Sequence, residues 1–183
     1  MLIEIPSPAL VVLIGAAGAG KSTVARRQFR PDEVVSSDET RGRLTGDPTN
    51  QRVTRRAFAI LHREVADRLL AGRLVVVDAT SVERHARSSL RRLARAAGVP
   101  TVAVALVMPA ADVHARNAAR PGRVVPTEVV DHHLRLIGRL GSSPMEVGAT
   151  LIAEGFDAVR VISTSAELDD VVVVRRPPGP PTR

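Results

Sequence analysis

The sequence predicts one α/β domain with a parallel sheet of about five strands, covered by helices on both faces. Continuous apolar runs, typical of strands buried on both faces, alternate along the chain with segments of helical periodicity. The 183 residues are 44% hydrophobic and 25% charged, which is the composition of a globular protein of ordinary domain size. Together these observations favour a doubly covered parallel sheet.

The predicted elements follow one another in regular alternation. The apolar runs that we interpret as strands lie at residues 9–14, within 32–36, and at 74–77, 101–107 and 158–162. Helices are predicted from residue 21 onward, from 38 onward, and over 50–72, 83–97, 111–120, 126–140 and 143–155. In the last of these, Ser143, Pro144 and Glu146 form the pattern of a capping box. The domain is expected to cover residues 1–174, followed by a disordered Pro/Arg-rich tail over 175–183.

Composition excludes several classes of site. The chain has no cysteine, so disulfides, thiolate metal sites and cysteine nucleophiles are excluded. Three phenylalanines are the only aromatic residues, which argues against a site built from stacked aromatic platforms. The N-terminal segment lacks the pattern of a signal peptide, and no apolar run is long enough to span a bilayer. We therefore expect a cytoplasmic protein that does not interact with membranes.

A glycine-rich segment follows the first long apolar run. Residues 15–22 match the pattern G-x-x-x-x-G-K-[ST], between a predicted strand and a predicted helix. Such a loop turns several backbone N–H groups toward one phosphate, and the helix N-terminus adds a partial positive charge. Lys21 is the only lysine among 26 basic residues, and it stands at the position that contacts the β- and γ-phosphates. The expected nucleotide-binding residues are Gly15, Ala16, Ala17, Gly18, Ala19, Gly20, Lys21, Ser22 and Thr23.

Two acidic residues follow predicted strands at the edge where a phosphate loop lies. Asp38 ends the second strand, and as a general base it would accept the proton of an attacking hydroxyl, with Arg41 on the same helical side. The alternative is that Asp38 only caps its helix and Arg41 is solvated. Ser22 is expected to ligate Mg²⁺, with Asp38 and Asp78 contributing through water. Alternatively, Asp78 binds loop N–H groups and has no metal role.

Two groups of arginines have helical spacing. Arg116, Arg120 and Arg123 are three to four residues apart, and this segment would form a lid that neutralises a transferring phosphoryl group. The sequence Pro121-Gly122 interrupts their helix. The second group, a stripe of Arg84, Arg87, Arg91 and Arg95, is expected to be a solvated face, the alternative being a contact surface for nucleic-acid phosphates. The histidines, including the pair His132 and His133, have no metal-ligand spacing and receive no role.

Several of these segments together resemble a known family. The segments Gly15–Ser22, Val35-Ser36-Ser37-Asp38-x-x-Arg41, Val76-Val77-Asp78-Ala79-Thr80 and Arg116-x-x-x-Arg120 occur in that order. This set is similar to the kinase module of bacterial polynucleotide kinase-phosphatase end-repair enzymes and, more distantly, to the phage polynucleotide kinases. The resemblance extends from Leu2 to about Val174.

The resemblance implies an ATP-dependent kinase of 5′-hydroxyl ends of DNA or RNA, with ATP or another NTP as donor, Mg²⁺ as metal, and nucleic acid as partner. It implies Asp38 as general base, Arg41 as a contact to an acceptor phosphate, and Arg116 and Arg120 as contacts to ATP phosphates. Gln51 and Arg52 fall where the family begins its acceptor-side helix. Ser81 departs from the family, which usually has asparagine there. The family's phosphatase and ligase-like modules are missing from this sequence, so removal of 3′-phosphates is not expected, and separate phosphatase or ligase proteins are candidate partners.

Two other functions remain open on the sequence alone. The first is a P-loop kinase whose acceptor is the hydroxyl of a small molecule, such as a sugar nucleotide or an antibiotic. The second is an NTP-dependent switch that has no acceptor. The formal net charge of +7 and Arg41 favour a phosphate-bearing polymer over the small molecule, whereas the switch would be recognised by ATP hydrolysis that neither oligonucleotide nor Asp38→Ala affects.

Overall fold

The computed structural model describes residues 1–46, 54–121 and 124–177, and it contains the predicted parallel sheet. Its five strands lie in the order β3-β4-β2-β5-β6, and every neighbouring pair is parallel. Their bounds are Leu10–Gly15 for β2, Val34–Ser36 for β3, Val75–Asp78 for β4, Thr101–Leu106 for β5 and Ala158–Ile162 for β6. The predicted fold class is confirmed.

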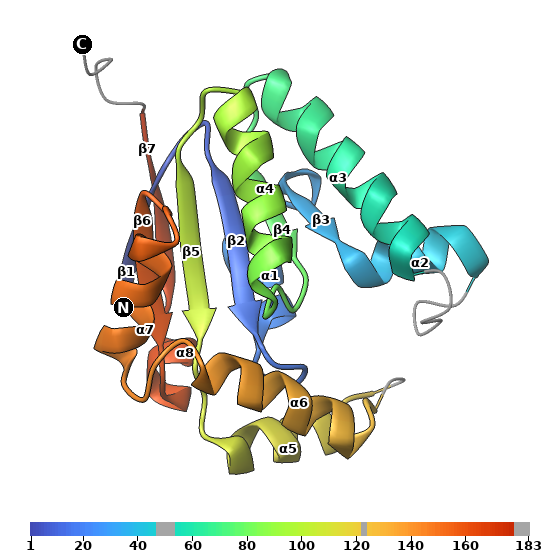
Figure 1. The fold of residues 1–183 in the computed structure, drawn as a ribbon, viewed down its shortest axis with the longest axis vertical. Coiled ribbons are helices and arrows are strands. Elements are labelled where there is room, and N and C mark those ends of the chain that lie inside the picture. Colours follow the sequence, from blue (N-terminus) through green and yellow to red (C-terminus); the bar gives the residue numbers. More distant parts are fainter. Residues whose placement is uncertain (47–53, 122–123, 178–183) are drawn as a thin grey trace.

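The helices from α1 to α7 lie close to the predicted positions, and a short helix α8, which was not predicted, follows β6. Their bounds are Lys21–Gln28 for α1, Ser37–Thr45 for α2, Thr54–Leu70 for α3, Arg84–Ala96 for α4, Ala110–Ala118 for α5, Thr127–Gly138 for α6, Pro144–Ala153 for α7 and Ser165–Asp169 for α8. A short 3₁₀ turn, η1, covers Pro31–Glu33. Figure 1 shows α5 and α6 beyond the carboxyl ends of β2 and β5, where ligands of parallel sheets bind.

The central strand β2 explains why both faces of the sheet are covered. Its side chains alternate between two hydrophobic cores, as the two-residue period of a strand requires. Val11 and Leu13 pack in the core that includes Val24 of α1. Leu10, Val12 and Ile14 pack in the opposite core, to which α3 contributes Leu61, Val65 and Leu69. All of these side chains are buried.

A second, two-stranded sheet was not predicted. Strand β1 (Leu2–Pro6) pairs in parallel with β7 (Val172–Arg176), in a register that places Ile5 opposite Arg175. Arg175 donates hydrogen bonds to the buried Glu33 from Nε at 3.2 Å and from Nη2 at 2.5 Å. The prediction that the tail begins at residue 175 is therefore wrong for Arg175 and Arg176. Residues 178–183 lie outside the described residues.

The start of α7 differs in one detail from the predicted capping box. The Ser143 hydroxyl accepts a hydrogen bond from the Glu146 N–H at 3.3 Å, as predicted. The Glu146 carboxylate accepts instead from the N–H of Ser142, at 2.8 Å. The reciprocal bond of the box is thus displaced by one residue, and Ser143 remains the cap.

No helix within the described ranges is long and apolar enough to cross a bilayer.

Candidate active site

The glycine-rich loop joins β2 to α1, and its glycines are required by close packing. Gly18 has a φ of +89°, and a Cβ there would lie 2.5 Å from the carbonyl oxygen of Val113 in α5. Gly20 has a φ of +105°, and a Cβ there would meet Leu168 of α8 at 2.8 Å. Because side chains rarely adopt this backbone conformation and have no room here, glycine is needed at both positions. The loop is thereby fixed between α5 and α8.

Lys21 is the first residue of α1, and its side chain is only 8% exposed. Its ammonium donates hydrogen bonds to the carbonyl oxygens of Gly15 at 2.9 Å and Ala16 at 2.7 Å, so it lies over the loop. Burial lowers its pKa to about 8, an effect that Asp78 and Asp38 partly oppose. A buried ammonium of this kind is stabilised when phosphate anions enter the site.

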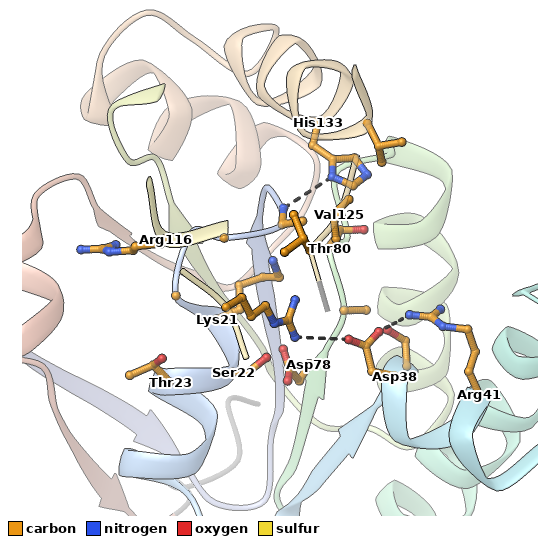
Figure 2. Close-up of a pocket in the computed structure, with 18 of the residues that line it drawn as sticks. Lys21, Ser22, Thr23, Asp38, Arg41, Asp78, Thr80, Arg116, Val125 and His133 are labelled. Carbon is orange, nitrogen blue, oxygen red and sulfur yellow. Dashed lines mark hydrogen bonds and ion pairs between the residues drawn. The ribbon is translucent and has the colours of Figure 1, made fainter. Parts of the chain in front are cut away.

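Ser22 and Thr23 follow in the first turn of α1, and both line one cavity of about 1020 Å³ together with Asp38 and Asp78. Figure 2 shows the Ser22 and Asp78 side chains close together beneath Lys21. One hydroxyl and two carboxylates suit Mg²⁺, which prefers oxygen ligands and keeps several waters and phosphate oxygens in its shell. The residues present therefore fit the predicted metal.

Asp38 is the second residue of α2, and it does not cap that helix. The cap is Ser36, whose hydroxyl accepts from the N–H of Glu39 at 3.5 Å. The Asp38 carboxylate instead pairs with Arg41 through Oδ1 and with Nη2 of Arg120 through Oδ2 at 3.5 Å. Figure 2 shows Asp38 between two basic groups and facing the cavity. The alternative that Asp38 serves only as a cap is wrong.

The side chain of Arg41 is only 7% exposed, so the alternative of a solvated arginine is also wrong. It lies on the far side of Asp38 from Lys21 in Figure 2 and lines the same cavity. Two arginines from different elements hold this one carboxylate and so fix its position.

The predicted lid arginines separate in space. Helix α5 ends at Ala118, so Arg120 lies beyond it and reaches Asp38. Arg116 remains on the helix, and its Nη2 donates to the Ser165 hydroxyl of α8 at 2.8 Å. Both line the cavity, although α5 ends between them and only Arg116 lies on the helix. Arg123 lies outside the described residues.

The acceptor-side pair Gln51 and Arg52 also lies outside the described residues. Among the cavity-lining residues that sequence reasoning missed are Phe58 of α3 and His133 of α6. The Nδ1 atom of His133 accepts a hydrogen bond from the N–H of Ala17 at 3.4 Å. Burial, with the charge of Lys21, lowers its pKa to about 4. No sequence signal marks this contact, because it depends on how α6 crosses the loop.

The arginine stripe of α4 is neither a solvated face nor a uniform basic surface. Arg87 is 2% exposed, and its guanidinium donates to both carboxylate oxygens of Glu154, at 2.8 and 2.6 Å. Arg91 lies over the ring of Phe156, with its guanidinium carbon 5.6 Å from the centroid. Two of the four arginines therefore join α4 to the segment after α7, while Arg84 and Arg95 are exposed.

Ser81 has a backbone conformation that few residues other than glycine adopt. Its φ of +46° is the left-handed conformation, which asparagine tolerates better than most residues. The serine is buried, and its carbonyl oxygen accepts from Nη1 of Arg87 at 3.0 Å. The position is thus a turn between β4 and α4 that holds the chain next to the cavity.

Comparisons with known proteins identify the family and support the fold. The model of the family described as AAA domain matches residues 10–140. No curated protein matches significantly.

Among solved structures, the chain is similar to a candidate kinase from Chloroflexus aurantiacus, with a TM-score of 0.60, 15% identity, and coverage of 86% of this chain and 85% of that one. It is similar to a chain of the Pnkp1/Rnl/Hen1 RNA repair complex, with a TM-score of 0.61, 23% identity and coverage of 74% of this chain. The match spans only 45% of that repair chain. A gluconokinase from Sinorhizobium meliloti matches with a TM-score of 0.53, 18% identity, and coverage of 91% and 88%.

Proposed function

The chain belongs to this AAA domain family, and we propose that it is an ATP-dependent kinase of the 5′-hydroxyl ends of nucleic acids. The fold is that of a P-loop kinase, which supports nucleotide binding and phosphoryl transfer. The observation that carries the proposal of transfer to a hydroxyl is the position of Asp38, while Arg41 and the charge of the cavity favour an acceptor with phosphates. Its carboxylate, held by Arg41 and Arg120, faces the same cavity as Lys21.

On the donor side, the loop N–H groups and Lys21 would bind the β- and γ-phosphates. Ser22, with Asp38 and Asp78 through water, would hold Mg²⁺ next to them. When bound, the metal neutralises charge on the phosphates. Lys21 would neutralise further charge on the phosphates. Burial disfavours its ammonium form in the free protein, and contact with phosphate would stabilise that form.

On the acceptor side, Asp38 would accept the proton of the 5′-hydroxyl as its oxygen attacks the γ-phosphorus. The bond from phosphorus to the bridging oxygen of ADP breaks in the same step. Arg120 contacts Asp38 in the free protein and lies at the cavity, where its guanidinium would neutralise charge on the transferring group. Arg41 would bind the phosphate that follows the terminal nucleoside.

The charge of the cavity supports an acceptor that carries phosphates. Five cationic side chains line it, against the two carboxylates of Asp38 and Asp78: they are Lys21, Arg26, Arg41, Arg116 and Arg120. The whole chain has a net charge of +7. A surplus of guanidinium groups is suited to a polyanion, whose binding would weaken steeply with salt.

A small hydroxyl compound is the second candidate acceptor. A gluconokinase has a similar fold over nine tenths of this chain, so the architecture is compatible with a small-molecule acceptor. Such an acceptor would use the same base and the same loop. The two candidates differ in the salt dependence and in the need for a phosphate next to the reacting alcohol.

The test is a transfer assay with γ-labelled ATP and a panel of acceptors. We expect label on an oligonucleotide with a free 5′-hydroxyl, none on the same oligonucleotide with a 5′-phosphate, and a KM for the oligonucleotide that rises with salt. Label on gluconate or a nucleotide sugar, with none on any oligonucleotide, would replace the proposal with the second candidate.

A further inference from the structure

A recess opens beside the cavity, between α3, the start of α4 and α6. Its volume is about 390 Å³, and it shares Phe58, Thr80 and His133 with the main cavity. Figure 2 labels Thr80 and His133, which lie near each other above Lys21. The two spaces therefore lie side by side, so that an acceptor whose alcohol is at Asp38 would have the recess next to it.

The recess differs from the cavity in charge. The cavity is lined by five ammonium and guanidinium groups. The recess is lined by one guanidinium, that of Arg55, by the carboxylate of Glu83 with the opposite formal charge, and by imidazoles. Burial lowers the pKa of His62, and burial with Lys21 lowers that of His133 to about 4, so both rings are neutral at pH 7. Phosphate groups are favoured in the cavity, whereas an uncharged group is favoured in the recess.

The lining of the recess suits a flat heteroaromatic group. Phe58 supplies a ring, and the imidazole of His62 stands edge-on to it with the centroids 6.3 Å apart. Val82 and Leu136 add apolar surface, and Glu83 and Ser89 add hydrogen-bonding groups at the start of α4. Aromatic rings bind bases by stacking regardless of sequence, and a few polar groups fix their orientation. A volume of about 390 Å³ is large enough to hold one base.

We infer that this recess binds the base of the terminal nucleotide of the acceptor, while the cavity binds the neighbouring phosphate and the reacting hydroxyl. The inference rests on the proposed function, since it assigns a site to one part of that acceptor. Phe58 lines both spaces. Its role is to position the terminal nucleoside, so its loss should raise KM more than it lowers kcat.

The experiment compares two oligonucleotides that differ only in their first nucleotide. Both have a free 5′-hydroxyl; one begins with thymidine and the other with a tetrahydrofuran abasic nucleotide. For the unaltered protein we expect kcat/KM to be about tenfold or more higher on the base-bearing end, mainly through KM. Phe58→Ala should lower the value on the base-bearing end by a larger factor than on the abasic end, so that the ratio between the two ends falls to about one.

Ile60→Ala is the matched control, because Ile60 lies on the same helix, is 38% exposed and does not line the recess. It should keep the full preference for the base-bearing end. Phe58→Leu, which keeps the apolar volume, should retain part of the preference and shows whether a loss in Phe58→Ala arises from folding.

Equal kcat/KM values on the two ends for the unaltered protein would overturn the recess proposal and leave the kinase assignment intact. The same holds if Phe58→Ala kept the preference for the base. If the unaltered protein transferred phosphate to neither oligonucleotide, both the proposed function and the inference would fall.

Discussion

Arg87 of α4 and Arg120 after α5 each belong to a row of arginines at helical spacing in the sequence. In the structure they differ in burial and in the groups that they contact. Arg87 is 2% exposed and binds both oxygens of Glu154 and two backbone carbonyls. The side chain of Arg120 is 33% exposed and makes one ion pair of 3.5 Å, with Asp38, at the edge of a cavity. Spacing alone therefore does not tell an arginine of the fold from an arginine of the site.

The two arginines differ in how far their ion pairs are buried and in whether water reaches them. Arg87 and Glu154 are both buried, so neither has water to replace the other. Arg120 is held loosely enough to exchange Asp38 for a phosphate oxygen. If this interpretation is correct, changes at the first residue should affect unfolding and changes at the second should affect turnover.

The largest effect is expected for Arg87→Met. It leaves the Glu154 carboxylate buried without its main partner, so we expect the free energy of unfolding to fall by about 3–5 kcal/mol, measured by urea denaturation. The double variant Arg87→Met/Glu154→Gln should recover part of the loss, because the unpaired charge is gone. A loss below about 1 kcal/mol for the single variant would mean that Arg87 does not join α4 to α7 as described.

Arg120→Ala tests the other side of the comparison. Removing a group that neutralises charge in the transition state should lower kcat by about 10²–10³-fold in the transfer assay. The thermal midpoint should stay unchanged, since the side chain is partly exposed and its single pair is long. Arg139→Ala, at an exposed arginine after α6, is the control and should keep full activity. Equal losses in both variants would argue against a specific role.

Lys21 is a third kind of basic residue, since it is buried and yet belongs to the site. At pH values between its pKa of about 8 and the ordinary 10.5, the side chain of Lys21 is mainly the neutral amine in the free protein. Bound triphosphate should restore its charge, so binding takes up a proton and ATP affinity falls as pH rises above 8, by at most tenfold per pH unit. Calorimetry at pH 9 in buffers of different ionisation enthalpy measures this uptake. No uptake at pH 9 would contradict the lowered pKa.

The smallest effect is expected for Arg84→Ala. Arg84 shares the stripe with Arg87, but its side chain is 81% exposed and lies 4.0 Å from Glu154. We expect its removal to change the free energy of unfolding by less than about 0.5 kcal/mol. A cost close to that of Arg87→Met would show that the stripe acts as one unit and would remove the contrast drawn above.

The sequence predicted the large sheet and the phosphate loop because each has a local signal. Continuous apolar runs mark buried strands, and the spacing of glycines with Lys21 marks the loop. It missed β1 and β7, whose pairing joins the two ends of the described chain and has no local pattern. It also placed Arg175 in a disordered tail, since nothing in the sequence reveals that Glu33 is its buried partner.

The site divides in the same way. Asp38 and Lys21 were predicted to face one cavity because both follow strands of a parallel sheet, and the topology alone brings those ends together. Two other features depend on how α3 and α6 pack against the sheet. They are the contact of His133 with Ala17 and the position of Phe58 in the lining of both the cavity and the recess. Such arrangements are set by packing of side chains over the whole domain, so sequence spacing does not encode them.

The most direct test of the central claim, that Asp38 activates an alcohol opposite the phosphate loop, is single-turnover transfer by Asp38→Asn. The same preparation is used to measure ATP affinity. We predict that transfer to a 5′-hydroxyl oligonucleotide falls by about 10²–10⁴-fold while ATP binds no more weakly than in the unaltered protein. Unchanged transfer, or a loss of transfer matched by an equal loss of ATP affinity, would contradict the claim.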